Sequence, residues 1–423
     1  MLRSRPGIFR ILALASLTLA TVSLTACPFP GATSGPGSPA GGTPGASGSL
    51  DKSFGQDGIV TTDFADENSD VAYGVALQEN GRIVAAGVST DGGTGLFALV
   101  RYMPNGDPDT GFGTEGRVFT ARGMTTQGKD VAVTADGKIV TGGWFQSFSS
   151  AMDLMLSRHL PDGQLDESFG DGGHAIAGYG SAIGNKLALQ SDGKILLTGY
   201  NGMLEYKPVL LRYTADGKPD SSFGTDGKVQ LDWGTDEDKA YAIAEAGGKI
   251  VIAGSAKADG FALSRLNADG SLDTGFGTGG TVKVETGENV AQGLAVASDG
   301  RIVVAGDARV MRFNADGGID SSFGTGGAVE LAEQSLHAVV LQPDGKLLLA
   351  GGQAGKVSLV RLKADGKLDE TFADQGVARV AAPDAASEAY DLVLQPDGRI
   401  VLAGKAYQSE GGHDDFLVMR FWP

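Results

Sequence analysis

One spaced set of residues recurs along this chain: an Arg, an Asp eight positions later and a Phe three positions after that. Successive Phe residues are separated by 58, 57, 54, 53, 47 and 49 residues, a mean period of 53. A seventh copy is divided between the two ends of the repeat region. Its Asp51 and Phe54 come before the first whole copy, and its Arg420 comes after the last one. The six whole copies are Arg101/Asp109/Phe112, Arg158/Asp166/Phe169, Arg212/Asp220/Phe223, Arg265/Asp273/Phe276, Arg312/Asp320/Phe323 and Arg361/Asp369/Phe372.

Each period contains four short β-like runs. The first two are joined by a tight turn, and such dipeptides between β runs are a strong hairpin signal. The second run, as in Ile302-Val303-Val304-Ala305-Gly306, is apolar at successive positions, which indicates a strand covered on both faces. Together with a period near 50 and 67 Gly residues, this predicts an all-β fold. We expect residues 50–423 to form a single seven-bladed β-propeller of four-stranded antiparallel blades. The turns are Asn80-Gly81, Asp136-Gly137, Asp192-Gly193, Gly247-Gly248, Asp299-Gly300, Asp344-Gly345 and Asp397-Gly398.

The order of the runs predicts how the ring closes. If the fourth run of each period is the outermost strand, the chain begins with an outer strand (58–63) and ends with a third strand (416–421). The N-terminal strand should then complete the last blade and leave no open sheet edge. The Arg and Asp of each copy should meet as structural pairs, with Arg420 reaching Asp51 across the closure.

The repeat resembles a known family. Leu-Asp-x-x-Phe-Gly-x-x-Gly, beginning at Leu50, and Gln-x-Asp-Gly-Lys-Ile-x-x-x-Gly, as at Gln190 to Gly199, are similar to the delta-60 repeat family of bacterial proteins. The resemblance covers residues 50–423. It implies a propeller in an extracytoplasmic setting, and it brings no shared catalytic residues.

The first 27 residues have the features of a targeting segment. A basic start is followed by an apolar run, Ile11 to Leu24, and then by Leu24-Thr25-Ala26-Cys27. This resembles a bacterial lipoprotein signal peptide with its lipobox, which implies cleavage before Cys27 and lipidation of that residue. An ordinary secretory signal is the alternative. Cys27 is the single Cys of the chain, so no intramolecular disulfide can form.

Residues 28–49 carry no charge and are rich in Gly, Pro and Ser, so we expect a disordered tether between lipid and domain. The resemblance places the protein in the cell envelope, anchored to the membrane through Cys27. Pro28 stands where an inner-membrane retention signal has Asp, which favours the outer membrane or the cell surface. The leaflet stays open.

The net charge of −17 argues against nucleic acid as a partner, since binding to phosphate backbones depends on Lys and Arg. We expect a monomer. No Gly-x-Ser-x-Gly elbow, phosphate loop or catalytic Cys is present, and no catalytic residue is assigned.

A binding surface is best sought where the copies differ. Long, irregular loops gather on one face of the predicted ring and carry aromatic and acidic side chains that could hold a protein, peptide or glycan. The candidate binding rim is Asp66, Glu67, Asp70, Trp144, Phe145, Phe148, Tyr200, Tyr206, Trp233, Asp236, Glu237, Asp238, Tyr407, His413, Asp414 and Asp415.

Two functions are compatible with this rim. The first is a non-enzymatic binding or scaffold module, and the alternative is a carbohydrate-active enzyme that uses paired carboxylates. Calcium at Asp236-Glu237-Asp238 is a further option, although no complete calcium-loop motif occurs. No His or Cys cluster indicates zinc, so no metal ligands and no cofactor are assigned.

Overall fold

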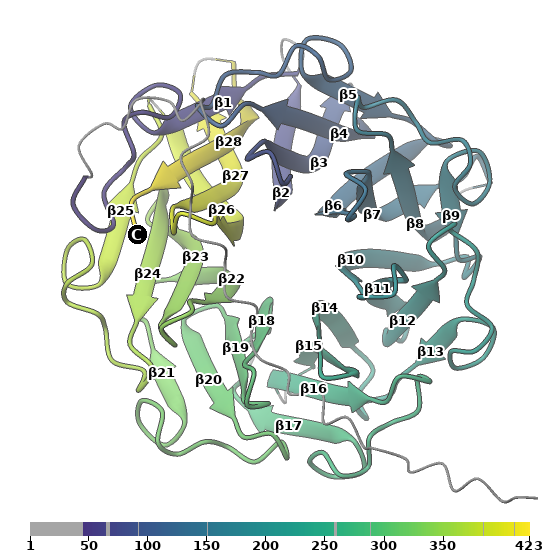
Figure 1. Cartoon of the computed structure of the whole chain (residues 1–423). Helices are drawn as coiled ribbons and strands as arrows, with labels where there is room; N and C mark the ends of the chain where they lie inside the picture. Colours follow the sequence, from purple (N-terminus) through teal and green to yellow (C-terminus); the bar gives the residue numbers. More distant parts are fainter. Residues whose placement is uncertain are drawn as a thin grey trace, which may run out of the picture. The chain divides into compact units, whose positions relative to one another are not determined.

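Seven four-stranded antiparallel sheets follow one another around a central axis in the computed structural model (Figure 1). The structure describes residues 45–423 except 65–67, 92, 150, 258–259, 288, 384 and 410. The lipobox Cys27, the segments 1–27 and 28–44, and the rim residues Asp66 and Glu67 lie outside these residues. The predicted fold class, an all-β seven-bladed propeller, is confirmed. Over the described ranges, the structure contains no helix long and apolar enough to cross a membrane.

Six blades are continuous in sequence, and each runs from an inner strand to an outer one. They are β2 (Ser69–Leu77), β3 (Ile83–Asp91), β4 (Thr94–Tyr102) and β5 (Arg117–Thr120); β6 (Thr125–Val133), β7 (Ile139–Gln146), β8 (Met152–His159) and β9 (His174–Ile176); β10 (Ala182–Leu189), β11 (Ile195–Asn201), β12 (Lys207–Tyr213) and β13 (Lys228–Gln230); β14 (Asp238–Ala246), β15 (Lys249–Ala256), β16 (Gly260–Leu266) and β17 (Thr281–Glu285); β18 (Gly293–Val296), β19 (Ile302–Gly306), β20 (Arg309–Phe313) and β21 (Ala328–Glu330); β22 (Ser335–Leu341), β23 (Leu347–Gln353), β24 (Lys356–Leu362) and β25 (Val377–Val380).

The seventh sheet combines both ends of the described chain. Its order is β1 (Ile59–Thr62), β28 (His413–Phe421), β27 (Ile400–Gln408) and β26 (Ala385–Leu394). β1 pairs antiparallel with β28, from Ile59 opposite Met419 to Thr62 opposite Phe416. Figure 1 shows the purple β1 beside the yellow β28. The fourth strand of this sheet therefore comes from the N-terminal side of the domain.

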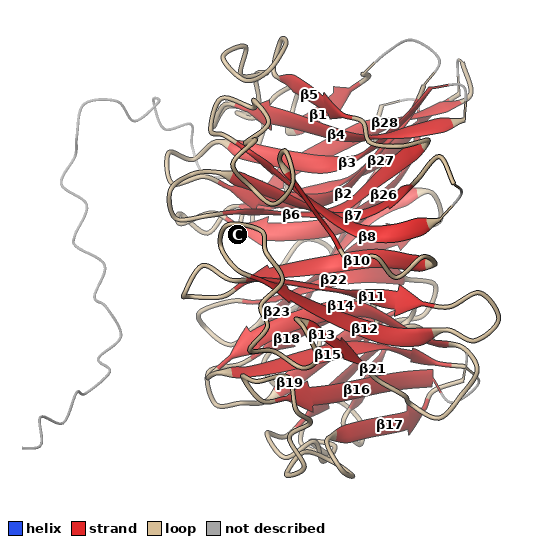
Figure 2. Ribbon diagram, turned by 90° about the vertical axis from the view of Figure 1, so that its right-hand side faces the viewer, coloured by secondary structure: helices blue, strands red, loops and turns tan. Residues whose placement is uncertain are grey.

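The hydrophobic cores lie between neighbouring blades. On β11, Leu196 packs into a cluster with Ile243 and Ile250 of the next blade. The adjacent Leu197 faces the other way, into a cluster with Val140 of the preceding blade. Because successive strand residues point to opposite faces, a strand between two blades must be apolar at every position. Figure 2 shows the strands running between two faces at which the loops gather.

The repeated Arg, Asp and Phe join each blade to its neighbour. Arg212 illustrates the unit: its Nε lies 2.8 Å from Asp220 Oδ2, and its guanidinium stacks 4.3 Å from the centre of the Phe223 ring. The same guanidinium donates to the carbonyl of Ala268 in the next blade. All seven Arg–Asp pairs form, and all seven Phe side chains are fully buried. The repeated charges are thus structural.

Candidate axial binding site

Seven side chains, one from each blade, converge on the axis of the ring. Together with Lys186 they line a cavity of about 220 Å³. Each occupies the same place in its repeat, and five residue types occur there, with Tyr in three of the blades. The seven are Tyr73, Lys129, Asn185, Tyr241, Gln292, His337 and Tyr390. A binding site on the axis can therefore be chemically varied while the blades stay alike.

A β-bulge turns these side chains toward the axis. In the pairing of β2 with β3 the register shifts between Ala72 and Gly74, which leaves Tyr73 as the extra residue. Gly87 on β3 makes this geometry possible, because a Cβ there would lie only 1.8 Å from the carbonyl oxygen of Val71. Corresponding shifts occur in five further blades, and Gln292 directly precedes β18 in the remaining one. The Gly that ends each apolar second strand thus permits the bulge.

Lys186 holds two carboxylates together across the cavity. Its Nζ lies 3.0 Å from Asp130 Oδ1 and 3.2 Å from Asp391 Oδ2, which come from two other blades. Both acids also accept backbone hydrogen bonds, from Leu187 (2.9 Å) and Val75 (3.1 Å). Burial alone would favour the neutral amine, but the two carboxylates outweigh it and raise the pKa of Lys186. Lys186 is therefore a permanent cation that offsets these acids.

Lys129 is a second cation in the cavity, and it has a different environment. Its Nζ lies 3.7 Å from the centre of the Tyr73 ring. No carboxylate of the described residues is within ion-pair distance of it. Burial lowers the pKa of Lys129 to about 8. The cavity thus contains an ammonium group whose charge is balanced only by an aromatic face.

His337 links the cavity to the surface. Its Nδ1 lies 2.7 Å from Gln292 Oε1, and its Nε2 lies 2.8 Å from Glu388 Oε1. Tyr390 donates its hydroxyl to the other oxygen of Glu388 at 3.0 Å. The hydrogen bond from His337, followed by that from Tyr390, outweighs burial and lowers the pKa of Glu388. This carboxylate is therefore held as an anion by its two neighbours.

Glu388 also borders a larger groove of about 780 Å³ between the last two blades. This groove contains two residues of the predicted rim, Tyr407 and Asp414. The Tyr407 side chain is 45% exposed, and Asp414 Oδ2 lies 3.4 Å from Lys405 Nζ. Glu388 thus lines this groove and is hydrogen-bonded to two residues of the axial cavity, His337 and Tyr390.

A second group of rim residues adjoins the cavity. The rings of Tyr200 and Tyr206 are 5.4 Å apart and meet edge to face, and Tyr200 lies 6.1 Å from Tyr241 of the cavity wall. Lys239 Nζ is 4.4 Å from the Tyr206 ring centre. These aromatic side chains extend the axial site toward the sheets β10–β13 and β14–β17.

Other predicted rim residues belong to the interior. Phe145 and Trp233 are 7% and 2% exposed, and the Trp233 indole N–H donates to Ser264 Oγ at 2.9 Å. Asp70 and Asp238 are fully buried. These four side chains pack between or within blades, so they are not available to a ligand at the surface. Large aromatic residues in these loops close the ends of the cores.

The remaining rim residues are scattered. Trp144 is half-buried on β7, Phe148 is exposed, and Asp236 is exposed on a different loop. His413 and Asp415 lie on the opposite side of β28 from Asp414. The predicted rim is thus not one continuous surface: two pairs, Tyr407 with Asp414 and Tyr200 with Tyr206, lie near the axial cavity, and the other described rim residues are buried or lie elsewhere.

Two of the three acidic residues of 236–238, the calcium candidate, have partners within the protein. Asp238 accepts hydrogen bonds from the backbone of Trp233 (2.7 Å) and from Thr235 Oγ1 (2.5 Å). Glu237 pairs with Lys257 at 2.5 Å and with Lys239 at 3.5 Å. Their oxygens are already used by the protein itself.

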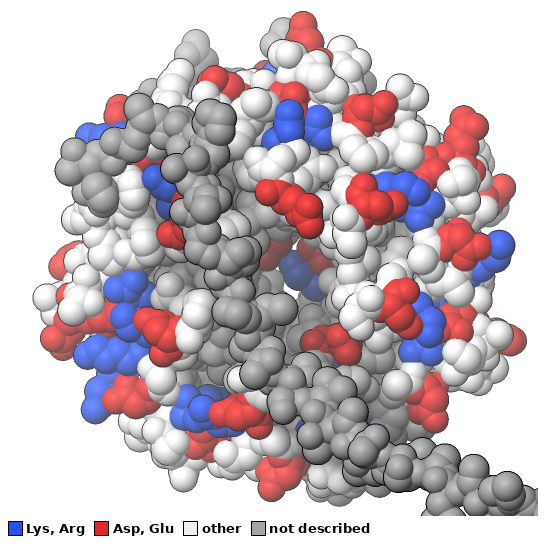
Figure 3. All heavy atoms as spheres, viewed as in Figure 1, with Lys and Arg blue, Asp and Glu red and all other residues white. Residues whose placement is uncertain are grey.

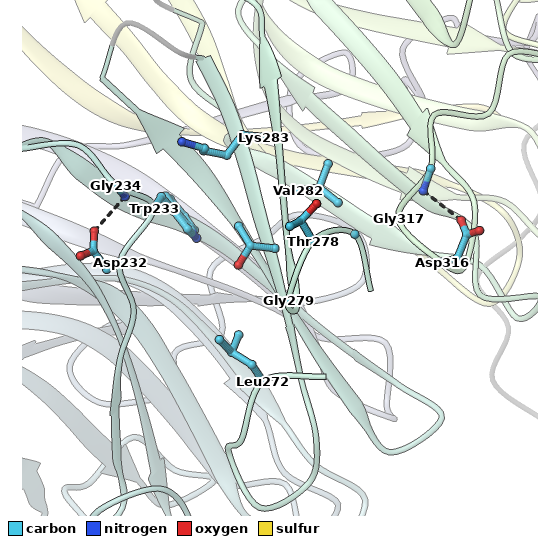
Figure 4. Close-up of a pocket in the computed structure, with 13 residues that line it drawn as sticks. Asp232, Trp233, Gly234, Leu272, Thr278, Gly279, Val282, Lys283, Asp316 and Gly317 are labelled. Carbon is cyan, nitrogen blue, oxygen red and sulfur yellow. Dashed lines mark hydrogen bonds between the residues drawn. The ribbon is translucent and has the colours of Figure 1, made fainter. Parts of the chain in front are cut away.

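A large outer groove of about 1010 Å³ lies at the periphery, between blades four and five (Figure 4). It is lined mainly by Gly-rich turns of the repeat, including Gly277 and Gly317. Asp232 accepts a hydrogen bond from the backbone of Gly234 at 2.8 Å. Because these turns recur in every blade, this groove has little that is specific to one ligand.

The charged side chains also differ between rim and axis. Figure 3 shows acidic and basic side chains distributed together around one face, with a hollow at the centre of the ring. Many exposed charges are local turn pairs, such as Lys218 with Asp216 at 2.7 Å. Such exposed pairs contribute little to stability or recognition. The axial cavity, in contrast, contains Lys129, which has no ion-pair partner among the described residues.

The fold and the repeated Arg–Asp–Phe unit define the class of this protein as a seven-bladed β-propeller. A family model described as "Domain of unknown function (DUF5122) beta-propeller" matches residues 78–112, 134–169, 190–223, 248–276, 297–323, 342–372 and 395–423. The chain belongs to this family, in agreement with the predicted delta-60 type of repeat. A comparison with curated proteins gives no match.

Several solved structures are similar in outline. Sqt1 from Chaetomium thermophilum, in complex with the N-terminus of the ribosomal protein L10, is 11% identical, with a TM-score of 0.47 over 86% of this chain and 98% of that one. A protein of unknown function from Dyadobacter fermentans is 13% identical, with a TM-score of 0.47 over 86% and 97%. A gluconolactonase from Xanthomonas campestris is 14% identical, with a TM-score of 0.36 over 73% and 96%. These similarities do not bear on the function of this chain.

Proposed function

We propose that this protein is a non-enzymatic binding propeller that holds a small acidic sugar, of the uronic acid type, in its axial cavity. The observation that carries the proposal is the Lys129 ammonium, which faces the cavity with no carboxylate partner among the described residues. Lys129 is partly buried, and a charge that is partly removed from water without a counter-charge is costly, so an anion in the cavity would be favourable.

The other groups around the cavity suit a sugar. Tyr73 and Tyr241 present aromatic faces, and Asn185 and Gln292 bring amides that can donate to or accept from hydroxyl groups. A volume of about 220 Å³ is below the roughly 300–1,000 Å³ typical of pockets for drug-sized ligands, which favours a small ligand or the end of a longer glycan.

A binding role is favoured over glycoside hydrolysis by the state of the acids. Hydrolysis of this kind uses two carboxyl groups that are free to exchange protons or attack. Here Asp130 and Asp391 share Lys186, and Glu388 is held by His337 and Tyr390. These contacts support positioning of a ligand more than turnover.

Calorimetric titration of the full chain tests the proposal. Glucuronate should bind more tightly than glucose, and Lys129→Met should lose roughly tenfold or more of the glucuronate affinity, since a hydrogen bond to a charged group contributes about 1.5–3 kcal/mol. Lys218→Met, at an exposed lysine, is the matched control and should bind as the parent does. Equal binding by the Lys129 and Lys218 variants would refute the assignment.

We further propose that the binding domain is displayed in the cell envelope by a lipid on Cys27. The lipobox-like Leu24-Thr25-Ala26-Cys27 and the uncharged segment after it support this. Metabolic labelling with an alkyne fatty acid should mark the parent and not Cys27→Ser. Labelling of both proteins would count against the anchor.

A further inference from the structure

A group of metal-ligating side chains lies away from the axial cavity, where the two ends of the domain meet. Asp63 directly follows β1, and His413 and Asp415 lie at the start of β28, two positions apart and so on the same face of the strand. The register that sets Thr62 opposite Phe416 brings Asp63 next to Asp415. One ligand atom from each of the three residues lies within 4.8 Å of the others.

Several buried polar atoms in this group have no hydrogen-bond partner among the described residues. They are Asp63 Oδ1, His413 Nδ1 and Asp415 Oδ1. Asp415 is only 7% exposed, and its Oδ1 lies 3.5 Å from His413 Nε2, a separation at the outer limit for a hydrogen bond. Unsatisfied buried groups of this kind are uncommon in folded proteins. Their concentration at one point is suited to a ligand that attracts oxygen and nitrogen donors.

The surroundings orient one of the donors, and the neighbouring Lys405 is paired elsewhere. Gln408 Nε2 donates to Asp415 Oδ2 at 2.8 Å, which leaves Oδ1 on the side of His413. The nearby Lys405 pairs with Asp414, which points to the opposite face of β28. Hydrogen bonds that fix a ligand in this way are typical of metal centres.

The donor set indicates the class of ion. Calcium and magnesium are bound through oxygen atoms, whereas an imidazole together with carboxylates suits first-row transition metals such as zinc, manganese or iron. We propose that Asp63, His413 and Asp415 bind one divalent first-row transition metal ion, which joins the N-terminal strand β1 to the C-terminal strand β28. The ion would then hold the ring closed in the one sheet whose strands come from opposite ends of the domain.

Thermal unfolding of the full chain, with Cys27 kept reduced, tests this site. After treatment with a chelator, one equivalent of Zn²⁺ should raise the melting temperature by several degrees, and Ca²⁺ at the same concentration should not. Asp63→Asn and His413→Gln should each weaken Zn²⁺ binding roughly tenfold or more, measured by competition with a chromophoric chelator. Asp171→Asn, at an exposed aspartate, is the control and should retain the parent's affinity.

Two further outcomes decide the assignment. In the presence of a chelator, Asp63→Asn should have a melting temperature equal to or above that of the parent, because it removes one of several crowded negative charges. A lower melting temperature would mean that Asp63 stabilises the fold without any metal, which would count against the proposal. Co²⁺ bound to the parent should show weak visible bands of nitrogen and oxygen coordination. A thiolate charge-transfer band would instead place the ion at Cys27 and overturn the proposal, as would equal stabilisation by Ca²⁺.

Discussion

Arg420 Nε lies 2.8 Å from Asp51 Oδ2, although the two residues are 369 positions apart in the chain. Their side chains are 7% and 1% exposed, and Arg420 also donates to the carbonyl of Pro104 in the first blade. Six Arg–Asp pairs each form within a continuous blade. Arg420 and Asp51 form the same salt bridge between the C-terminal and the N-terminal parts of the domain. It also connects the last blade to the first.

We predict that Arg420→Met lowers the free energy of unfolding by about 3 kcal/mol, because it leaves the buried Asp51 with only part of its compensation. Arg399 Nε also lies 2.8 Å from Asp51 Oδ2 and would remain as a partner. We therefore expect a loss of stability at the lower end of the roughly 3–5 kcal/mol that breaking a buried ion pair costs. Urea unfolding followed by circular dichroism measures the change. Arg265→Met is the matched control, since its pair is more exposed (16%) and should cost less. An equal loss of unfolding free energy in both variants would show that the Arg420–Asp51 pair contributes no more to stability than a pair within a continuous blade.

Replacing a bulge glycine should damage the axial site through the backbone. In Gly351→Ala the added Cβ would lie 1.8 Å from the carbonyl oxygen of Ser335, next to the bulge that carries His337. We expect a loss of about 1–3 kcal/mol in stability and a parallel loss of ligand affinity. Gly275→Ala, whose Cβ would meet nothing closer than 3.5 Å, should be nearly neutral in both measurements.

Two buried histidines should make stability depend on pH. Burial, with the charge of His174, lowers the pKa of His159 to about 4, and burial, with the charge of Arg122, lowers that of His174 to about 4. Their ordinary value is near 6.5, so the unfolded chain binds protons first as the pH falls. Stability should therefore decrease from pH 6.5 toward pH 4, by up to about 3 kcal/mol for each ring.

Urea unfolding at pH 7, 5.5 and 4.5 measures this dependence. His159→Gln keeps a polar group for Thr120, whose Oγ1 lies 2.8 Å from Nε2, and should flatten the decline. If the parent and the variant decline in parallel, the histidine is not the group that titrates.

Ligand binding should weaken in mild alkali. Burial lowers the pKa of Lys129 to about 8, so its ammonium group is lost as the pH rises through that value. The affinity for an acidic sugar should fall several-fold between pH 7 and pH 9. Lys129→Arg keeps its charge throughout and should bind with little change over the same range. An unchanged pH profile in the parent would disconnect Lys129 from the ligand.

The fold could be predicted from the sequence because the same physical requirements are repeated in every blade. A strand such as Leu196-Leu197 must be apolar at adjacent positions to serve two cores, and a tight turn ending in Gly, with Asp before it in five blades, must follow the inner strand. Each requirement appears seven times, so chance matches are easily separated from the pattern.

The axial site could not be predicted by the same route, since a bulge is not visible in apolar periodicity. One signal was nevertheless present. Tyr73, Lys129 and His337 each lie three residues before a position that is Ala in five repeats and Val in two. Their own column is polar in every repeat and contains five residue types, with Tyr three times. The irregular segments of the sequence indicated Tyr200, Tyr206 and Tyr407 as candidate binding residues. It also selected Phe145 and Trp233, because sequence alone does not distinguish an aromatic side chain that closes a core from one that faces water.

The bulge on each inner strand separates the choice of ligand from the stability of the ring. The bulge depends on backbone geometry and on a glycine of the neighbouring strand, such as Gly87 beside Tyr73, and not on the type of the extra residue. Mutations at seven positions can therefore change the chemistry of the cavity one group at a time, without disturbing the cores between blades. Relatives with the same repeat could in this way diverge in what they bind while remaining equally well folded.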